Sequence, residues 1–470
     1  MGQLSSLIVM TADILTNRAI FRFWLPLAST WLMMAVEGPY LAAIIARLAD
    51  PTANLAAFGV AFAFAIIIEA PVIMLMAAST TLVKDRQSYL ALRRFTYGLG
   101  GALTLVQIVV LVPSIFDIVA RDLLALPPDV AQLTHGGLTW LLPWTFAIGY
   151  RRFRQGLLIR RRLTRRVAYG TGIRLATMSL TALIGYRWLS LPGSHLGALA
   201  LSAGVVAEAV ASRLMTTGVV RDVLRQERNS ERSMTLTLGT FVTFYAPLAL
   251  TSLIAMAVQP LVTFFMGQSR YALESLAVLP VVHGLTFIFR AIGLSYLEVV
   301  VALLGDKQQH VRILLRFGTI VGLAAATGLS MIAFTPLAAV WFRDVSGLTP
   351  GLTVFAVPPV RILSVFPALS VLLAMQRGFL LHSHRTRPIT WSTLLEVTTV
   401  GIGLTVAIHG LDLVGATAAA LAILSGRVVG NAWLLAPCLG VMRGVPTVRP
   451  EASSEPATTS RSLEETRGDR

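Results

Sequence analysis

The first half of this sequence recurs in its second half, with an offset of 221 residues from Pro26 to Pro247. Around these prolines, the stretch 23–30 reads FWLPLAST and the stretch 244–251 reads FYAPLALT. Further matches, with one residue of slippage along the way, are Leu55-Ala56 with Leu276-Ala277 and Arg121-Asp122 with Arg343-Asp344. A repeat of this length indicates that the chain folds as two copies of one structural unit.

The composition places both copies in a membrane. The chain is 55% hydrophobic and only 13% charged, and many apolar runs reach the roughly 20 residues that a helix needs to cross a bilayer. A backbone in lipid must satisfy its own hydrogen bonds, so these runs are predicted to be helices. We therefore expect an all-α integral membrane protein with twelve spans, at 22–46, 55–82, 95–116, 133–158, 167–188, 196–219, 237–266, 274–304, 317–342, 353–381, 389–409 and 413–442.

Basic residues predict the orientation. The net charge is +16, and the arginines and lysines gather in the loops that follow spans two, four, six, eight and ten. In the first four of these loops the basic residues are Lys84, Arg86, Arg93, Arg94, Arg160, Arg161, Arg162, Arg165, Arg166, Arg221, Arg225, Arg228, Arg232, Lys307, Arg312 and Arg316. By the positive-inside rule these loops and both termini are cytoplasmic, in an inner membrane. We interpret the positive charge as topology and expect no nucleic-acid partner.

Two lobes follow from this count. Each half has an even number of spans, so the repeats are parallel and related by a pseudo-twofold axis along the membrane normal. We predict an N-terminal six-helix lobe at 1–219, a cytoplasmic linker at 220–236, a C-terminal six-helix lobe at 237–442 and a cytoplasmic tail at 443–470. The tail is polar and is expected to be disordered.

Charges inside the predicted spans are the first candidate site residues, because a charge at membrane depth is costly. Glu69 in span two has Arg290 in span eight as its repeat equivalent, and Arg174 in span five has Glu396 in span eleven. Spans six and twelve hold Glu208 and Arg427. One interpretation is ion pairs within a lobe, Glu69 with Arg174 and Arg290 with Glu396. The other is that Glu69 and Arg290 face each other across a central cleft. For Arg174, Glu208, Glu396 and Arg427 we favour structural ion pairs.

Glu37 is the candidate for binding a coupling ion. It precedes Gly38-Pro39, and proline loosens a helix because it removes a backbone donor and its ring clashes with the preceding turn. A carboxylate beside freed carbonyls can bind H⁺ or Na⁺. The repeat equivalent Pro260 keeps the proline while Val258 lacks the acid. Four prolines are hinge candidates: Pro26, Pro39, Pro247 and Pro260.

Span eight supplies a second group of candidates. His283 and Arg290 are seven residues apart, about two helical turns, and so share a face. Histidine titrates near neutral pH and can relay protons. Glu298 lies further along the same span, and Arg361 in span ten is expected to add positive potential to the same cavity. The alternative for His283 is a packed, hydrogen-bonded side chain.

Enzyme signatures are missing from the sequence. There is no phosphate-binding loop with its lysine, no HExxH and no nucleophile elbow, and Cys438 is the single cysteine. We expect neither an enzyme nor a bound metal or other cofactor, apart from a coupling ion.

The sequence resembles a known family of membrane proteins. Two six-helix lobes that open with Phe-x-x-Pro-Leu, and a second span that ends at Lys84-Asp85-Arg86, resemble the multidrug and toxic compound extrusion (MATE) fold. This fold belongs to the multidrug/oligosaccharidyl-lipid/polysaccharide (MOP) exporter superfamily. Within it, Glu37, the stretch Leu55-Ala56-Ala57-Phe58-Gly59 and Gly156-Leu157-Leu158 are most similar to the progressive ankylosis protein group.

The resemblance implies a V-shaped exporter that works by alternating access, with spans one, two, seven and eight lining the cleft. For the ankylosis group it implies export of small anions, and in drug exporters acids of one lobe bind Na⁺ or H⁺. Our first hypothesis is therefore a monomeric secondary exporter of a small solute, such as an organic or phosphate-bearing anion. The alternatives are a flippase for a lipid-linked oligosaccharide or cell-envelope precursor and a non-transporting scaffold. Duplicated lobes with central charges disfavour the scaffold.

Overall fold

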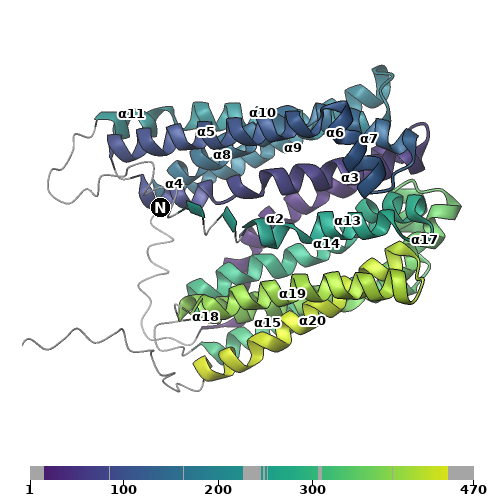
Figure 1. Ribbon diagram of the computed structural model, residues 1–470. Helices are drawn as coiled ribbons and strands as arrows, with labels where there is room; N and C mark the ends of the chain where they lie inside the picture. Colours follow the sequence, from purple (N-terminus) through teal and green to yellow (C-terminus); the bar gives the residue numbers. More distant parts are fainter. Residues whose placement is uncertain are drawn as a thin grey trace, which may run out of the picture.

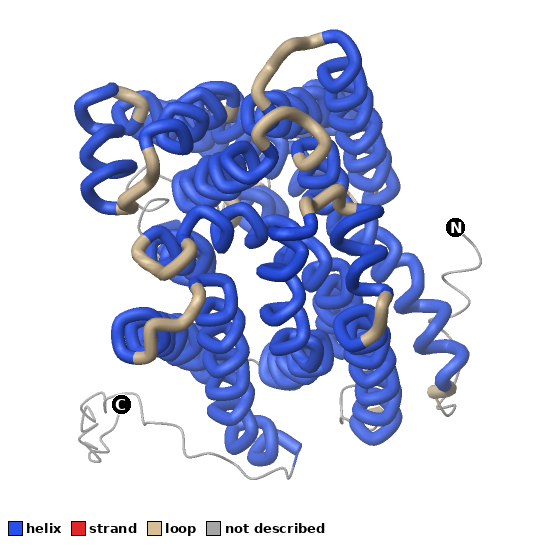
Figure 2. Tube along the Cα trace, turned by 90° about the vertical axis from the view of Figure 1, so that its right-hand side faces the viewer, coloured by secondary structure: helices blue, strands red, loops and turns tan. Residues whose placement is uncertain are grey.

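The computed structural model describes residues 15–83, 85–161, 163–225, 245–246, 249–250, 252–304, 310–383 and 385–442. Within these residues the regular structure is helical, and the isolated bridge between Arg270 and Val414 is the one strand-type pairing. The helices lie roughly along one direction in two groups, one above the other in Figure 1, and Figure 2 shows the same groups from the end. The predicted tail at 443–470 lies outside the described residues.

The N-terminal lobe contains the helices that Figure 1 shows from purple through blue to teal, up to α11. They are α2 (Asn17–Ile45), α3 (Pro51–Glu69), η1 (Ala70–Val72), α4 (Leu75–Leu82), α5 (Arg86–Val110), α6 (Pro113–Asp117), η2 (Ile118–Leu123), α7 (Pro128–Trp140), α8 (Leu142–Arg160), α9 (Thr164–Trp188), α10 (Gly193–Met215) and α11 (Thr217–Arg225). Helix α11 covers the beginning of the predicted linker, and residues 226–236 lie outside the described part.

The C-terminal lobe repeats this order. Its elements are α13 (Val258–Gly267), α14 (Ala272–Leu303), α15 (Val311–Phe334), α16 (Leu337–Ala339), η3 (Val340–Val345), α17 (Pro350–Ile362), η4 (Leu363–Val365), α18 (Phe366–His382), α19 (Arg387–Thr405), η5 (Val406–Gly410) and α20 (Gly415–Met442). Both Asn17 and Met442 lie at one end of the bundle, which we call the terminal end. The opposite end, which carries η2 and η3, is the distal end.

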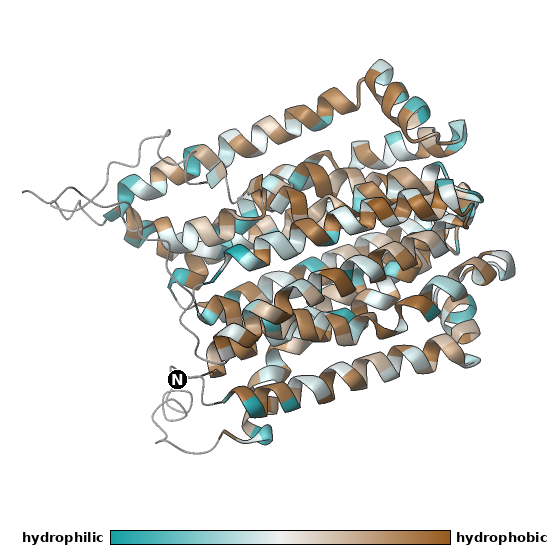
Figure 3. Ribbon diagram, turned by 60° about the horizontal axis from the view of Figure 1, so that its bottom comes forward, coloured by the Kyte–Doolittle hydropathy of each residue, from teal (hydrophilic) through white to brown (hydrophobic). Residues whose placement is uncertain are grey.

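Nine helices of the described part are long and apolar enough to cross a membrane, or ten if the bent pair α5 with α6–η2 is one span. The protein is therefore a multi-pass membrane protein, and many hydrophilic residues gather toward the helix ends (Figure 3). These nine or ten helices are compatible with the predicted twelve spans. The α7–α8 pass does not qualify because three arginines lower its hydropathy, and the seventh pass is described only in part.

Several predicted boundaries are shifted. Span three was expected at 95–116, but α5 begins at Arg86, because Asp85 and Ser88 form a capping box at its start. It ends at Val110, before Pro113, where the chain bends by 75°. The arginines at 93 and 94 therefore lie within the helix and not in a loop. Span nine behaves likewise, since α15 ends at Phe334 before Pro336.

The repeat extends to unusual backbone conformations. Asp50 and its equivalent Tyr271 cap α3 and α14 in the left-handed region, with φ of 47° and 54°. Ala125 (φ 51°) and its equivalent Gly347 (φ 74°) follow the two π-helical segments η2 and η3. Left-handed backbone is rare outside glycine, so its recurrence at equivalent positions supports the duplication independently of side-chain similarity.

The two lobes meet at the distal end. Arg47 of the N-terminal lobe donates from Nη2 to the backbone oxygens of Asp344 (2.7 Å) and Val345 (2.9 Å). Nearby, a Cβ at Gly267 would lie 2.3 Å from the Leu124 carbonyl oxygen. Only glycine allows this approach of two backbones. Polar and steric contacts thus close the molecule at this end.

Candidate functional site

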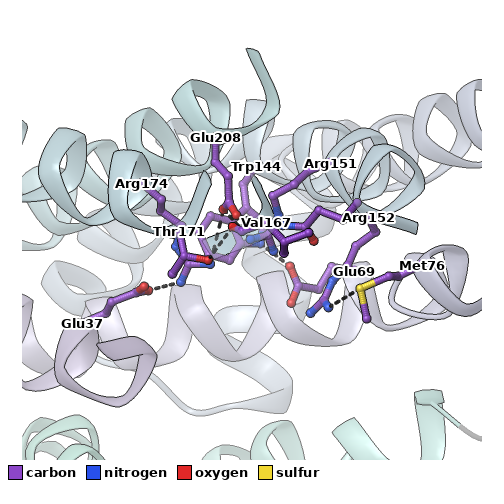
Figure 4. A network of polar contacts seen from close by, with 11 residues as sticks. Glu37, Glu69, Met76, Trp144, Arg151, Arg152, Val167, Thr171, Arg174 and Glu208 are labelled. Atoms are coloured by element: carbon purple, nitrogen blue, oxygen red, sulfur yellow. Dashed lines mark hydrogen bonds and ion pairs between the residues drawn. The ribbon is translucent and has the colours of Figure 1, made fainter. Parts of the chain in front are cut away.

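A cavity of about 400 Å³, the N-chamber, lies inside the N-terminal lobe and against α14. Its walls combine apolar side chains with charged ones. The charged residues that line it are Glu37, Glu69, Arg151, Arg152 and Arg174. They come from α2, α3, α8 and α9, so four helices must pack together before the group exists (Figure 4).

Arg174 is the centre of an ion-pair chain in this chamber. It donates from Nη2 to the Glu37 carboxylate, and its Nη1 lies 3.9 Å from Oε2 of Glu208. Glu208, which is fully buried, also accepts from Arg151 and, at 2.9 Å, from Nε2 of Gln155. A buried acid needs this many donors, because an unpaired buried charge is strongly destabilising.

Glu69 lies at the end of α3, where the helix gives way to the 3-10 turn η1. Pro71 in that turn lacks an amide hydrogen and so cannot continue an α-helical hydrogen-bond pattern. The carboxylate accepts a hydrogen bond from the indole of Trp144, and Arg152 is a charged neighbour. Arg152 itself contacts the Met76 sulfur at 3.9 Å. The kink thus directs an acid toward the chamber.

A second cavity of about 260 Å³, the C-chamber, lies in the C-terminal lobe. Arg427 donates from Nη2 to Oε1 of Glu396 at 2.7 Å. The Phe366 ring has the Arg427 guanidinium 4.8 Å from its centroid and the Arg290 guanidinium at 4.9 Å. Arg290 makes no hydrogen bond or ion pair with any described residue, and its Nε is buried. His283 lines both chambers and stacks on Phe287.

The structure decides between the pairings that the sequence left open. Glu69 does not pair with Arg174, because Glu69 accepts from Trp144 and Arg174 pairs with Glu37. Within the described residues, Glu69 does not pair with Arg290 either. Arg290 does not pair with Glu396, which accepts from Arg427 instead. The correct partner of Arg174 is Glu37. Repeat equivalence aligns positions along helices, but it does not say which neighbouring helix a side chain faces.

Two predicted site residues lie outside the chambers. Glu298 is exposed on α14 and lines neither cavity. Arg361 of α17 is also exposed, donates from Nε to the Ala333 oxygen at 3.1 Å and stacks on Phe334. The expectation that Arg361 adds to the same cavity as Arg290 is therefore wrong. Its helix turns the side chain toward α15.

The predicted hinges differ from one another. Pro26 and Pro39 both lie within α2, which is a continuous helix from Asn17 to Ile45. Pro260 follows a turn at Ala257, so the seventh pass is interrupted where α2 is not. Pro247 lies outside the described residues.

Sequence reasoning missed the arginines of α8. Arg151, Arg152 and Arg154 fall within the predicted span four, and the first two line the N-chamber. Arg154 instead reaches Thr216 at 3.2 Å and stacks on Tyr150. Three arginines in four residues of an apolar span were a visible signal, because intramembrane charges need partners.

The first helix of each repeat crosses to the other lobe near the terminal end. Trp24 of α2 donates from its indole to Ser295 Oγ of α14 at 2.8 Å and packs edge-on against Phe317 at 6.0 Å. Its repeat equivalent Tyr245 donates to the backbone oxygen of Pro71 in the N-terminal lobe. Tyr245 also packs edge-on against Phe95, the equivalent of Phe317, at 5.0 Å. We call these two contacts the aromatic latches.

Further along, α2 and α14 cross closely beside the N-chamber. A Cβ at Gly284 would lie 2.8 Å from Pro39 Cγ, so glycine permits this crossing. The same stretch of α2 contacts α9, where the Tyr40 hydroxyl donates to the Ser179 oxygen at 3.2 Å. Helix α2 therefore belongs to both lobes and carries Glu37 between them.

Neither a protein-family model nor a curated protein matches this sequence. Solved structures do match. An inward-facing multidrug resistance MATE family transporter of the MOP superfamily aligns over 88% of this chain and 96% of its own, with TM-score 0.70 and 16% identity. The lipid II flippase MurJ, in an inward closed conformation, aligns over 89% and 91%, with TM-score 0.65 and 12% identity. An outward-facing MATE family transporter aligns over 92% and 97%, with TM-score 0.62 and 15% identity. The chain therefore has the fold of MATE and MurJ transporters.

Proposed function

We propose that the protein is a secondary active exporter that works by alternating access between its two lobes, for a small solute such as an organic or phosphate-bearing anion. The observation that carries this proposal is the pair of charged chambers, one in each repeat, that adjoin between the lobes. Transporters built from repeats bind substrate near the repeat interface at mid-membrane depth. A scaffold needs no enclosed charges there.

The contacts between the two lobes indicate on which side of the membrane the molecule is open. Arg47 and Gly267 join the lobes at the distal end. The TM-score to the inward-facing MATE transporter is also higher than that to the outward-facing one. With both termini cytoplasmic, as the basic loops indicate, this is an inward-facing state. Export then requires the distal contacts to separate.

Glu37 is the proposed coupling site. Its carboxylate pairs with Arg174 on α9, while the other end of α2 is held by Ser295 on α14. Binding of H⁺ or Na⁺ at Glu37 weakens the pair with Arg174 and so changes the hold of the N-terminal lobe on α2. Coupling of this kind makes the protein an antiporter.

The proposed substrate class and membrane are argued from the sequence. The similarity of Glu37 and the 55–59 stretch to the progressive ankylosis group favours small anions as substrates. Arginine greatly outnumbers lysine, which fits a GC-rich bacterial genome, and we propose that the protein lies in the inner membrane of such a cell. We further propose that the protein acts as a monomer, because both chambers form within one chain.

A second candidate function is a flippase for a lipid-linked oligosaccharide or cell-envelope precursor. The likeness to MurJ, a lipid II flippase, favours it. Glycosyltransferase genes beside this gene would support a flippase, whereas a soluble exported metabolite would support the exporter.

Untargeted metabolite profiling tests the exporter directly. Media from cells with the gene, without it, and with an Arg174→Gln variant are compared. An anion that accumulates only with the intact gene supports export. Identical media, together with altered lipid-linked precursors in the membrane, would favour the flippase.

A further inference from the structure

The two chambers differ in charge balance. Around the N-chamber the acids Glu37, Glu69 and Glu208 are matched by Arg151, Arg152 and Arg174. Each of these acids accepts a hydrogen bond, and two of them accept from an arginine. Among the described residues this chamber is therefore electrically neutral. Its remaining wall is apolar and aromatic, with Phe58, Phe62, Phe287 and Trp144.

The C-chamber carries an excess positive charge. Arg427 and Glu396 neutralise each other at 2.7 Å, which leaves Arg290 without an acid among the described lining residues. Phe366 stacks with both guanidinium groups and so supports the Arg290 side chain from its face. Stacking leaves the guanidinium edge, with its N–H donors, free for an acceptor. An uncompensated charge at this depth is costly without such a partner.

The chambers share a wall. Both are lined by Ile66, Met256, Gln259, Leu279 and His283. Ile66, Met256 and Leu279 are apolar and Gln259 and His283 are polar, and Met256 and Gln259 belong to the interrupted seventh pass. A ligand that reaches Arg290 from the N-chamber therefore passes this shared wall, which presents both apolar and polar side chains.

We infer that the two chambers together form one site for a small amphipathic anion, with its carboxylate or phosphate on Arg290 and its apolar group in the N-chamber. This inference rests on the proposed transport function and specifies the substrate class. An arginine fork binds a planar carboxylate or a phosphate by two parallel bonds. The aromatic wall of the N-chamber removes the apolar group from water.

The chamber sizes favour a small solute over a long-chain lipid. The volumes of about 260 and 400 Å³ together fall within the range of about 300–1,000 Å³ that is usual for small-molecule sites. A polyprenyl chain exceeds that space. We therefore commit to a soluble anion with one ring or a short acyl group as its apolar part.

A matched set of three probes tests the inference on the purified full-length protein in detergent. 1-Naphthyl phosphate carries both features, 1-naphthol only the apolar ring, and inorganic phosphate only the charge. Binding is measured by equilibrium dialysis, without any transport step. We expect 1-naphthyl phosphate to bind at least tenfold more tightly than either fragment.

Three variants locate the charge. Arg290→Gln should weaken 1-naphthyl phosphate binding about 10- to 100-fold, the usual effect of losing hydrogen bonds to a charged group, and leave 1-naphthol binding unchanged. Arg290→Lys keeps the charge but loses the two-point fork, so it should fall between. The matched control is Arg361→Gln in the same lobe, which should bind all probes as the unchanged protein does. If Arg290→Gln does not fold, the Arg290→Lys result alone decides.

Equal affinity of all three probes, or an unchanged affinity in both Arg290 variants, would overturn the inference. Displacement of 1-naphthyl phosphate by long-chain phosphatidic acid, but not by benzoate or phenyl phosphate, would reassign the site to a lipid headgroup and also overturn it. These results are separate from the transport proposal. If binding depends on Arg290 but proteoliposomes show no transport, the binding site stands and the exporter proposal fails. If an anion is transported at the same rate in the Arg290 variants, the exporter proposal stands and the binding site fails.

Discussion

Trp24 and Tyr245 occupy equivalent positions in the two repeats, and each donates a hydrogen bond to the opposite lobe, to Ser295 and Pro71 respectively. Each also packs on an equivalent phenylalanine, Phe317 or Phe95. The first helix of each repeat therefore reaches across to the other lobe near the terminal end. A rocking motion of the lobes must either carry these contacts along or break them.

The aromatic latches are predicted to stabilise the present state. Tyr245→Phe removes one hydrogen bond between the lobes, which is worth about 0.5–1.5 kcal/mol, and should shift the opening equilibrium several-fold toward the alternative state. Spin-label distances across the distal end measure this shift. The matched control is Tyr296→Phe, which removes a bond to the Leu314 oxygen within one lobe. It should lower thermal stability without changing the distances, and equal distance changes in both variants would contradict the assignment.

The latches also mark how far sequence reasoning reaches. The duplication pairs Trp24 with Tyr245 and Phe95 with Phe317, so their equivalence could be predicted. The lobe that each side chain contacts could not be predicted, because a repeat aligns equivalent positions in the two copies and gives no information about contacts between the copies. The fold followed from apolar spans and orientation. Helix α8 is less apolar than the other spans because it carries several arginines.

Part of the membership of the charged site was predictable from the sequence, but the pairing of its residues was not. Glu37, Glu69, Arg174 and Arg290 stood out because each is a charge within an apolar span. Their partners depend on helix rotation and on the neighbour that each face meets, and these are set by packing of the whole lobe. Arg151 was not predicted as a site residue, because it lies close to the basic loop whose charge was attributed to membrane orientation.

Loss of the Glu208 charge should be strongly destabilising. Glu208→Gln leaves Arg151 without its acid in a fully buried position, and breaking a buried pair typically costs about 3–5 kcal/mol. The free energy of unfolding in detergent measures this. Asp117→Asn is the matched control, since its pair with Arg121 at 3.2 Å is about half exposed on both sides. That change should cost less than about 1 kcal/mol, and similar losses in both variants would argue against a buried network.

Glu69 should be coupled energetically to Arg152 and not to Arg290. In a double-mutant cycle, Glu69→Gln combined with Arg152→Gln should show an interaction free energy of about 0.5–3 kcal/mol. The cycle with Arg290→Gln should stay within about 0.5 kcal/mol of additivity, because Arg290 lies in the other chamber. If the cycle with Arg290 shows the larger interaction free energy, Glu69 and Arg290 pair across the cleft in another state of the protein.

Topology reporters should place all terminal-end loops on one side. Fusions after Asp85, Arg161 and Arg225 are expected to read cytoplasmic, and fusions after Asp50 and Ser346 external, because the basic loops set the orientation. The structure places the first three at the terminal end and the last two at the distal end. A consistent exchange of the two groups would reverse the proposed direction of transport, and a mixed pattern within either group would contradict the helix order.

Neutralising Glu37 should separate transport from its driving ion. Glu37→Gln keeps the size of the side chain and removes the charge that pairs with Arg174, while Glu208 at 3.9 Å still neutralises that arginine. The variant should therefore fold and insert, yet its transport rate in proteoliposomes should no longer respond to an imposed pH or Na⁺ gradient. Glu298→Gln is the same chemical change on an exposed face of α14, outside both chambers, and should keep the gradient response. A normal response in the Glu37 variant would move the coupling site elsewhere in the N-chamber. Glu69 is then the remaining candidate, because its carboxylate lines the same cavity and Gln at that position would retain the acceptor for Trp144.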